Sequence, residues 1–336
     1  MTSLIIVHPS FETVWPLAAE ELRAIWAAQG SLTFVRLDAG DDRALGAIDD
    51  APRDATRAVT LGVPVTPACL DRFGALREAA FQEPYAAVAG LDAAVAARSI
   101  RRYTQPTEGF WGQSVAEFAL ALTLCGLRRI PQLHHQIIAD QTPWDYKPPG
   151  GVGRPGARGH QLGDDLRFTS GTVAGKRVRI VGAGNIASRY ASFVAMLGAD
   201  VAAWDPFASE PSFHRAGSRR ERHLERLMTD AEIFAPLVPL TESTRGLVTA
   251  EHIAALPRGC LVVLATRAGV CDVAALRRRV CADEIALAAD VFDIEPLPLG
   301  DELLGRHNVV HTPHSAGRTV HANAQWAGAL ADQFLP

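Results

Sequence analysis

A six-residue run that follows an apolar strand constrains this chain most. Arg179-Ile180-Val181 reads as a strand, and Gly182-Ala183-Gly184-Asn185-Ile186-Ala187 then opens a helix. In this G-x-G-x-x-A pattern, Gly182 permits a tight turn, and Gly184 lets a diphosphate approach the backbone amides at the positive helix end. Asp205 stands 23 residues after Gly182, where a carboxylate accepts hydrogen bonds from a ribose and repels a 2′-phosphate. The pattern predicts a Rossmann turn that binds NAD; a purely structural turn and an S-adenosylmethionine site are the alternatives.

Strand and helix patterns alternate on both sides of this turn. In the first half, strands are expected at 4–8, 33–37 and 58–61, with a helix at 14–28 that stops at Gly30. In the second half, six strands are expected at 178–181, 200–204, 233–236, 261–264, 285–291 and 309–312. Strands that alternate with helices indicate an α/β protein with parallel sheets, and 336 residues suit about two domains.

Composition excludes several classes of protein. Hydrophobic residues make up 48% of the chain and charged residues 21%, which excludes a disordered or fibrous chain. The formal charge of −4 argues against a nucleic-acid binder. The five cysteines form no C-x-x-C pair, and the residues between His307 and His314 read as a strand rather than the helix that would place these histidines on one face, so no metal is expected. No signal peptide or membrane span is evident, so a cytoplasmic protein is expected.

Three further segments have their own predictions. The nearly all-apolar run Ser114–Ile130 predicts a buried helix that ends at Pro131. Residues 141–171 are rich in glycine and proline and read either as a functional cover or as a passive insert. The arginine-rich run Arg215–Arg226 predicts a solvated helix face, with assistance to a 2′-phosphate as the alternative.

Three polar residues follow late strands, at the sheet edge where ligands of such folds bind. Arg267 follows the strand at 261–264, Glu295 follows the strand at 285–291, and His314 follows the strand at 309–312. A guanidinium can hold a carboxylate and polarise an adjacent oxygen, an imidazole can move a proton, and a carboxylate can orient that imidazole. The set therefore predicts hydride transfer between a nicotinamide and a 2-hydroxy acid.

The spaced motifs resemble those of the D-isomer-specific 2-hydroxyacid dehydrogenases. The likeness runs from Ser114-Val115-Ala116-Glu117 through the glycine turn and Val238-Pro239-Leu240-Thr241 to Thr312-Pro313-His314-Ser315-Ala316-Gly317, over roughly residues 100–320. The resemblance implies a Rossmann NAD-binding domain at 106–317 and a smaller, flavodoxin-like substrate domain at 1–105, completed by 318–336. It also implies a homodimer supported by the helix near 114–130.

The resemblance assigns roles residue by residue. Arg267 is the substrate-binding arginine, His314 the acid/base and Glu295 its partner, while Asp290 faces the nicotinamide amide. The residues expected to bind the cofactor are Gly182, Gly184, Asn185, Ile186, Asp205, Val238, Pro239, Ala265, Thr266, Arg267, Asp290, His314, Ala316 and Gly317.

The chain departs from the family pattern near the substrate. Leu264 replaces the usual Asn, and Ala268 replaces a Gly beside Arg267. The first-domain loop that usually holds the substrate carboxylate is rich in glycine, whereas residues 81–87 of this chain contain none. Tyr85 and Ala86 are the substrate-binding candidates there, and we expect a substrate larger than glyoxylate or a carboxylate held mainly by Arg267.

The partner is therefore expected to be a small 2-keto or 2-hydroxy acid, with its identity, the physiological direction and the use of NADP left open. Two alternatives remain at this point. The first is an NAD(H)-sensing interaction protein of corepressor type, and the second is a dehydrogenase of another small anion such as phosphite or formate.

Overall fold

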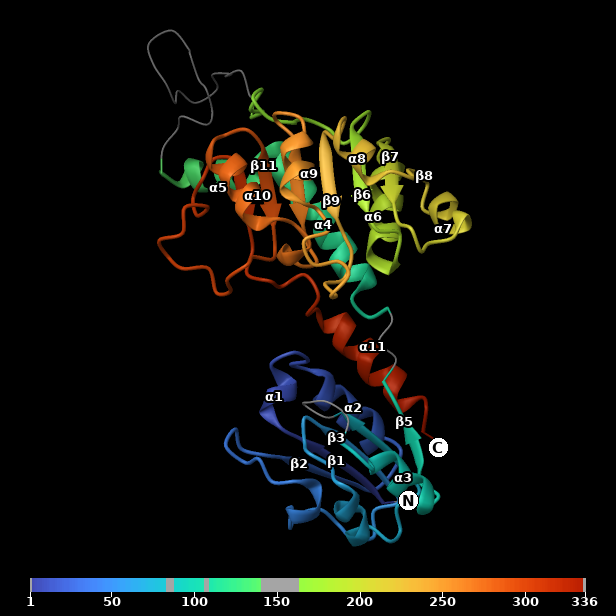
Figure 1. Ribbon diagram of the computed structural model, residues 1–336. Helices are drawn as coiled ribbons and strands as arrows, with labels where there is room; N and C mark the ends of the chain where they lie inside the picture. Colours follow the sequence, from blue (N-terminus) through green and yellow to red (C-terminus); the bar gives the residue numbers. More distant parts are fainter. Residues whose placement is uncertain (1, 83–87, 106–108, 140–162, 335–336) are drawn as a thin grey trace. The chain divides into compact units, whose positions relative to one another are not determined.

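The computed structural model describes residues 2–82, 88–105, 109–139 and 163–334, and the chain divides into two compact units (Figure 1). Unit 1 comprises Met1–Phe110 with Arg318–Pro336, and unit 2 comprises Trp111–Gly317. None of the helices in these described ranges combines the length and apolar character needed to cross a membrane.

Unit 1 is built on a five-stranded parallel sheet. Its strands are β1 (Ser3–Val7), β2 (Leu32–Arg36), β3 (Arg57–Leu61), β4 (Glu78–Gln82) and β5 (Arg101–Tyr103). Their order, β2-β1-β3-β4-β5, is the flavodoxin-like order of doubly wound folds. The fold class expected for this part of the chain is confirmed, although β4 and β5 were not among the predicted strands.

Both faces of this sheet are covered, because alternate residues of β1 enter different cores. Leu4 and Ile6 pack into one apolar cluster, and Ile5 and Val7 into the other. The helices of the unit are α1 (Pro9–Glu12), α2 (Ala18–Ala27), α3 (Leu91–Ala97) and α11 (Val320–Ala331). The helix expected at 14–28 begins only at Ala18, after Pro16. Helix α11 returns from the end of the chain, and the ring of Trp326 lies 5.7 Å from that of Trp15.

Unit 2 contains a seven-stranded parallel sheet. Its strands are β6 (Arg177–Val181), β7 (Asp200–Trp204), β8 (Arg219–Arg220), β9 (Ile233–Pro236), β10 (Leu261–Leu264), β11 (Ala286–Ala289) and β12 (Val309–His311). The order β12-β11-β10-β9-β6-β7-β8 is the Rossmann order with one further strand, and it reverses between β6 and β9. The six expected strands are all present, which confirms the predicted dinucleotide-binding sheet.

Strand β8, which was not among the predicted strands, corrects the prediction of one helix over Arg215–Arg226. Helix α7 (Glu210–Arg215) ends before Gly217, whose φ of +66° lies in the left-handed region. Arg219 and Arg220 then pair with Ala202 and Ala203 of β7, and a short helix α8 (Leu224–Met228) follows. The glycine ends the helix, and the residues that follow it pair with the edge of the sheet along β7.

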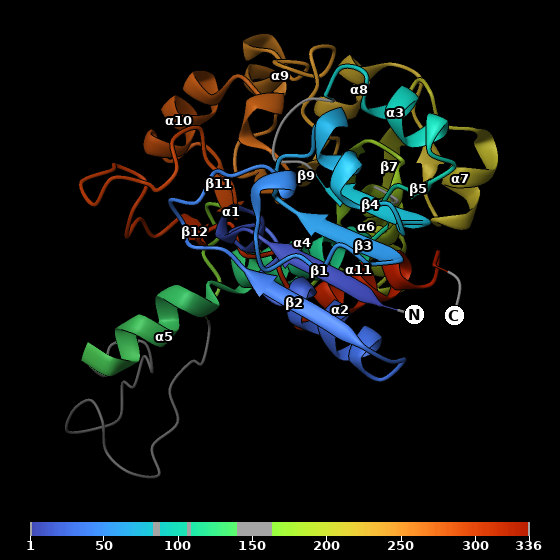
Figure 2. The same ribbon diagram turned by 90° about the horizontal axis from the view of Figure 1, so that it is seen from below.

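The remaining helices of unit 2 are α4 (Gly112–Arg128), α5 (Ile130–Ala139), α6 (Asn185–Met196), α9 (Ala250–Ala255) and α10 (Val273–Cys281). The sequence correctly predicts a buried helix at 114–130, but Pro131 does not end it. Helix α4 ends at Arg128 because Arg129 is left-handed, with a φ of +52°. Pro131 lies in the first turn of α5, where the missing N–H costs nothing. Figure 2 shows α5 projecting from the body of its unit.

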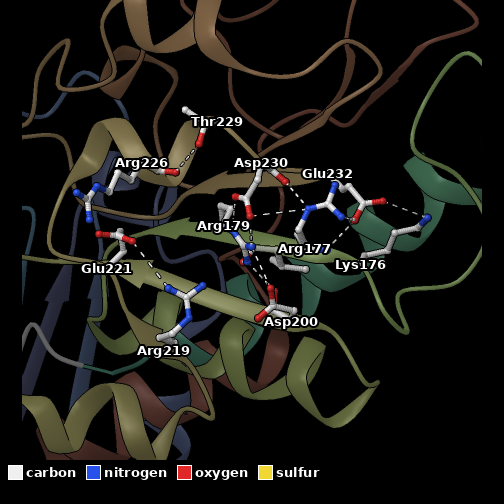
Figure 3. Close-up of polar contacts among 11 residues, drawn as sticks. Lys176, Arg177, Arg179, Asp200, Arg219, Glu221, Arg226, Thr229, Asp230 and Glu232 are labelled. Carbon is white, nitrogen blue, oxygen red and sulfur yellow. Dashed lines mark hydrogen bonds and ion pairs between the residues drawn. The ribbon is translucent and has the colours of Figure 1, made fainter.

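A buried arginine on β6, Arg179, forms ion pairs with two aspartates, Asp200 and Asp230 (Figure 3). The Arg179 side chain is only 3% exposed, and its Nη2 lies 2.6 Å from Asp230 Oδ2 and 3.0 Å from Asp200 Oδ2. Its Nε also donates to Asp230 Oδ1 at 2.8 Å. A buried charge is tolerated only when it is paired in this way. The network joins β6 to the start of β7 and to the turn before β9.

Removal of one partner is expected to destabilise unit 2 in a pH-dependent way. Hydrogen bonding to Arg179 is the main reason that the pKa of Asp230 lies below its usual range. A depressed carboxyl pKa adds stability above the unfolded value of about 4, and this stability is lost as the pH falls towards the folded pKa. We expect Asp230→Asn to cost about 1–2 kcal/mol at pH 7, because Asp230 is half-exposed and Asp200 still faces Arg179.

Thermal unfolding at pH 7 and at pH 3 checks this expectation. Glu242→Gln, at an exposed carboxylate of the same unit, is the control and should leave the midpoint unchanged. A loss in Asp230→Asn that is as large at pH 3 as at pH 7 would show that the ion pair is not its cause.

Candidate active site

The glycine turn lies between β6 and α6, and its two glycines have different surroundings. Gly182 has a φ of +109°, and a Cβ there would lie 2.9 Å from Val238 Cγ1 and 3.0 Å from Leu237 O. Gly184 is exposed, and a Cβ there would meet nothing within 4 Å. Gly182 is therefore required by the packing of the turn, whereas Gly184 leaves open space in front of the helix amides. A diphosphate group fits this space.

Asn185 and Ile186 begin α6, and the side chain of Asn185 lies against α4. A Cβ on Gly112 would come within 2.6 Å of the Asn185 amide group, so a larger residue at the first position of α4 would require the Asn185 side chain to move. Gly112 was not among the residues expected at the site. A glycine at the start of an otherwise apolar helix was the available signal, but it does not identify its partner 73 residues later.

Asp205 follows β7, and its carboxylate is already oriented by backbone amides. Oδ2 accepts a hydrogen bond from Ala183 N at 2.8 Å, and Oδ1 accepts from Phe207 N and Ala208 N at 2.9 and 3.1 Å. A carboxylate offers about four lone-pair positions, so about one remains, on Oδ2. The structure thus places the Asp205 carboxylate directly beside the glycine turn. Because three backbone N–H groups already donate to it, it can accept a hydrogen bond from one ribose hydroxyl but not from two.

The other residues expected at the cofactor follow strands of the same sheet. Val238 and Pro239 follow β9, and Val238 contacts the position of Gly182. Ala265 and Thr266 follow β10, and the Thr266 hydroxyl donates to Pro236 O at 3.2 Å. The carboxyl ends of parallel strands meet at one edge, next to the reversal in strand order between β6 and β9.

Three side chains from this edge form a connected polar group. Glu295 Oε2 lies 2.7 Å from His314 Nδ1, and Arg267 Nη1 lies 3.5 Å from His314 Nε2. Glu295 Oε1 accepts a hydrogen bond from Phe292 N at 2.8 Å, which fixes the carboxylate. The residues Arg267, Glu295 and His314, chosen from separate loops of the sequence, are thus brought together.

Electrostatics favour one division of labour within this group. Burial raises the pKa of Glu295, but the hydrogen bonds from His314 and Phe292 and the charge of Arg267 outweigh it, and the net shift is downward. Glu295 is therefore a carboxylate near neutral pH, and Nδ1 of His314 carries a proton towards it. The other ring nitrogen, Nε2, faces the guanidinium of Arg267. An oxygen atom placed beside both Nε2 and Nη1 would receive two hydrogen bonds.

Asp290 holds the loop that carries His314. Its side chain is fully buried; Oδ1 accepts from Thr312 Oγ1 at 2.6 Å and Ser315 N at 3.0 Å, and Oδ2 accepts from Ala316 N at 2.9 Å. These contacts flank His314, whose φ of +53° is unusual for a residue with a side chain. The hydrogen bonds that Asp290 accepts therefore position the imidazole of His314. The resemblance implies a different role for Asp290, a contact with the nicotinamide amide. The same bonds occupy the N–H of Ala316.

The remaining positions singled out in the sequence add little to the geometry of the site. Tyr85 and Ala86 lie outside the described residues. Leu264 and Ala268, where the chain departs from the family pattern, both pack into an apolar core of unit 2. Gly317 ends unit 2, and a Cβ there would lie 3.0 Å from the Trp111 ring. Over the described ranges, no cluster of three or more histidine, cysteine or acidic side chains has a geometry that could hold a metal.

Comparison with known proteins agrees with this geometry. Residues 120–316 match the family model described as D-isomer specific 2-hydroxyacid dehydrogenase, NAD binding domain. The chain belongs to the D-isomer-specific 2-hydroxyacid dehydrogenase family. Its NAD-binding domain has the Rossmann order described above, and NAD is the cofactor of that domain.

This chain matches a different share of the length of each relative. A D-3-phosphoglycerate dehydrogenase of Archaeoglobus fulgidus is 29% identical over 223 residues, which are 66% of this chain but 38% of that protein. A hydroxypyruvate reductase of Thermotoga maritima is 30% identical over 233 residues, 68% of each chain. The chain thus spans well under half of the phosphoglycerate dehydrogenase.

The family fold extends over the whole chain. The NAD-complexed structure of the D-isomer specific 2-hydroxyacid dehydrogenase of Lactobacillus delbrueckii ssp. bulgaricus superposes on this chain with a TM-score of 0.69 at 17% identity. The superposition covers 99% of this chain and 96% of the Lactobacillus chain. At that identity the likeness concerns the fold alone.

Proposed function

We propose that this protein is an NAD-dependent oxidoreductase that interconverts a 2-keto acid and the corresponding D-2-hydroxy acid. One observation carries the proposal: Nε2 of His314 and Nη1 of Arg267 lie 3.5 Å apart, with Glu295 behind the imidazole. Both groups stand at the sheet edge that carries the glycine turn of the cofactor. A proton donor and a cation beside one position suit an oxygen that gains negative charge during reduction.

The residues then divide the chemistry of ketone reduction. Bound NADH supplies the hydride that C2 of the keto acid accepts. Arg267 holds the substrate carboxylate and polarises the C2 oxygen with its forked N–H groups. His314 donates the proton on Nε2 to that oxygen as it becomes an alkoxide, and Glu295 stabilises the imidazolium before transfer. In the oxidative direction His314 Nε2 takes the hydroxyl proton instead.

Unit 1 is proposed as the substrate domain and unit 2 as the dinucleotide-binding domain. The glycine turn, Asp205 and the group around His314 all belong to unit 2. Unit 1 has a flavodoxin-like sheet whose strand β4 leads into residues 83–87, where Tyr85 and Ala86 are the proposed substrate contacts. A loop without glycine favours a substrate larger than glyoxylate.

Initial rates of NADH oxidation with a panel of 2-keto acids test the proposal. Glyoxylate, pyruvate, hydroxypyruvate, phenylpyruvate and a branched-chain keto acid cover a range of sizes. We expect turnover of at least one acid, with a larger kcat/KM for a bulkier member than for glyoxylate. Tight NADH binding without turnover of any acid would contradict the proposal and favour an NAD(H)-sensing interaction protein.

Asp205 is expected to determine the preference for NADH over NADPH. Its carboxylate repels a 2′-phosphate and offers an acceptor to the ribose. We expect Asp205→Ser to weaken NADH binding about tenfold or more, as loss of a hydrogen bond to a charged group predicts, and to weaken NADPH binding less. Fluorescence titration with both cofactors measures the ratio. A parallel loss for both would indicate that Asp205 acts only by shaping the glycine turn through Ala183 N.

We propose that the protein forms a homodimer. The resemblance implies a dimer supported by the helix near 114–130, and exposed apolar side chains continue from there along the next helix, α5. Three isoleucines of this projecting helix are exposed, namely Ile130 at 51%, Ile137 at 47% and Ile138 at 72%. We expect light scattering to give twice the chain mass for the wild type, and Ile138→Glu to give a monomer because a carboxylate would be buried at the interface. Leu299→Glu, at an exposed leucine in a loop of the same unit, is the control. A monomeric wild type, or a dimeric Ile138→Glu variant, would contradict the proposal.

A further inference from the structure

A groove runs between α6 and α7, on the flank of the glycine turn. Its volume is about 400 Å³, and Gly184 of the glycine turn is among its lining residues. Five of the side chains that line it carry hydroxyl or guanidinium groups. Helix α6 contributes Ser188, Arg189 and Ser192, and α7 contributes Ser212 and Arg215. Nothing in the dehydrogenase mechanism uses these side chains.

Two arginines, Arg189 and Arg215, give this groove its positive charge. Over the described residues, the structure records no carboxylate paired with Arg189 or Arg215. Arg219 and Arg220, close by in the sequence, lie 3.8 and 3.5 Å from Glu221 and Glu210. Arg189 Nη1 instead donates to Asn185 O at 3.1 Å, which turns its guanidinium towards the start of α6. The charge therefore adds to the positive end of the α6 dipole.

Hydroxyl groups lie beside these two guanidinium groups. Ser188 and Ser192 are one turn apart on α6, so they share a face of the helix, and Ser212 lines the same groove from α7. Guanidinium forks and hydroxyl donors together match the oxygens of a phosphate group. The lining residues include no acidic side chain. The lining of the groove thus suits an anion and not an apolar or cationic ligand.

We propose that this groove binds a phosphate group that is not part of the NAD diphosphate. Ser192 lies two turns along α6 from Gly184, about 12 Å at 1.5 Å per residue, so a diphosphate held at the turn does not fill the groove. The phosphate belongs either to a free anion, such as a diphosphate-bearing metabolite, or to the 2′-position of NADPH. Asp205 repels a 2′-phosphate at the end of β7, which favours the free anion.

Calorimetric titration of inorganic pyrophosphate into the protein saturated with NADH tests the proposal. We expect binding that weakens at least tenfold in the double variant Arg189→Gln/Arg215→Gln. The control is Arg222→Gln, at an exposed arginine outside the groove, which should bind pyrophosphate as the wild type does. The assay needs NADH binding but no turnover, so its failure is distinguishable from failure of the proposed dehydrogenase activity.

A second titration identifies the source of the phosphate. If the groove receives a 2′-phosphate, the double variant should lose affinity for NADPH about tenfold while its affinity for NADH is unchanged, and pyrophosphate should not bind the NADPH complex. The proposal is overturned if pyrophosphate binds only in the absence of NADH, because it then occupies the diphosphate position of the cofactor. It is equally overturned if pyrophosphate does not bind the NADH complex and the ratio of the NADPH and NADH affinities is the same in wild type and double variant.

Discussion

Replacement of His314 by alanine is expected to lower kcat for keto-acid reduction by about 10²–10⁴-fold, the usual contribution of a general acid. The reason is geometric: Nε2 is the ring nitrogen beside Arg267, and Nδ1 is engaged by Glu295 at 2.7 Å. Steady-state rates at saturating NADH and keto acid measure the effect. His311→Ala, at an exposed residue three positions earlier, should keep wild-type kcat. A His314→Ala variant within tenfold of the wild type would show that another group supplies the proton.

Glu295→Gln separates orientation from proton transfer at the same site. The amide can still contact Nδ1, but the negative charge that favours the protonated imidazole is lost. Because the pKa of Glu295 is lowered in the wild type, the carboxylate acts over the whole neutral range. We expect the alkaline loss of reductase activity to begin at a lower pH in Glu295→Gln. Identical pH profiles for variant and wild type would mean that Glu295 does not influence the proton on His314.

Replacement of Arg267 by alanine is expected to have the second large effect, on both KM and kcat. The substrate carboxylate loses a charged fork, and the C2 oxygen loses a donor as its charge develops. Two charged hydrogen bonds at about 1.5–3 kcal/mol each correspond to a fall in kcat/KM of about 10²–10⁴-fold. Arg267→Lys keeps the charge but loses the fork, and should recover only part of the loss.

A matched arginine lies at the opposite end of β10. Arg258 precedes this strand and pairs with Glu284 at 2.9 Å, whereas Arg267 follows it. Arg258→Ala should therefore leave KM for the keto acid unchanged. If Arg267→Ala raised KM by no more than Arg258→Ala did, the carboxylate would be bound by other residues.

The parts of the fold that could be predicted are those whose strands are rich in valine, isoleucine and leucine. Arg177–Val181 and Leu261–Leu264 are recognisable because their residues are buried on both faces of a parallel sheet. Strand β4 was missed because its apolar residues are two alanines and one phenylalanine rather than β-branched residues or leucine, and β5 because it has only three residues, two of them arginines. Glu78 is 6% exposed and accepts a hydrogen bond from the Tyr103 hydroxyl at 2.7 Å. A polar pair between neighbouring strands therefore replaces the apolar pattern there.

The active site divides in the same way. Arg267, Glu295 and His314 could be predicted because each follows a strand and belongs to a motif of the family. The contacts that set their geometry join residues far apart in sequence, such as Asp290 to Ser315. No local pattern reports such a contact. The same is true of Gly112 and Asn185, whose fit depends on how two helices pack.

Hydride transfer to C2 is tested most directly with NADH that carries deuterium at both C4 positions. The keto acid with the highest kcat/KM is reduced to completion, and the product is examined by mass spectrometry and chiral chromatography. If the proposed function is right, each NADH consumed yields one 2-hydroxy acid of D configuration with deuterium at C2. An unlabelled product, an L product, or NADH that binds without being consumed would contradict it.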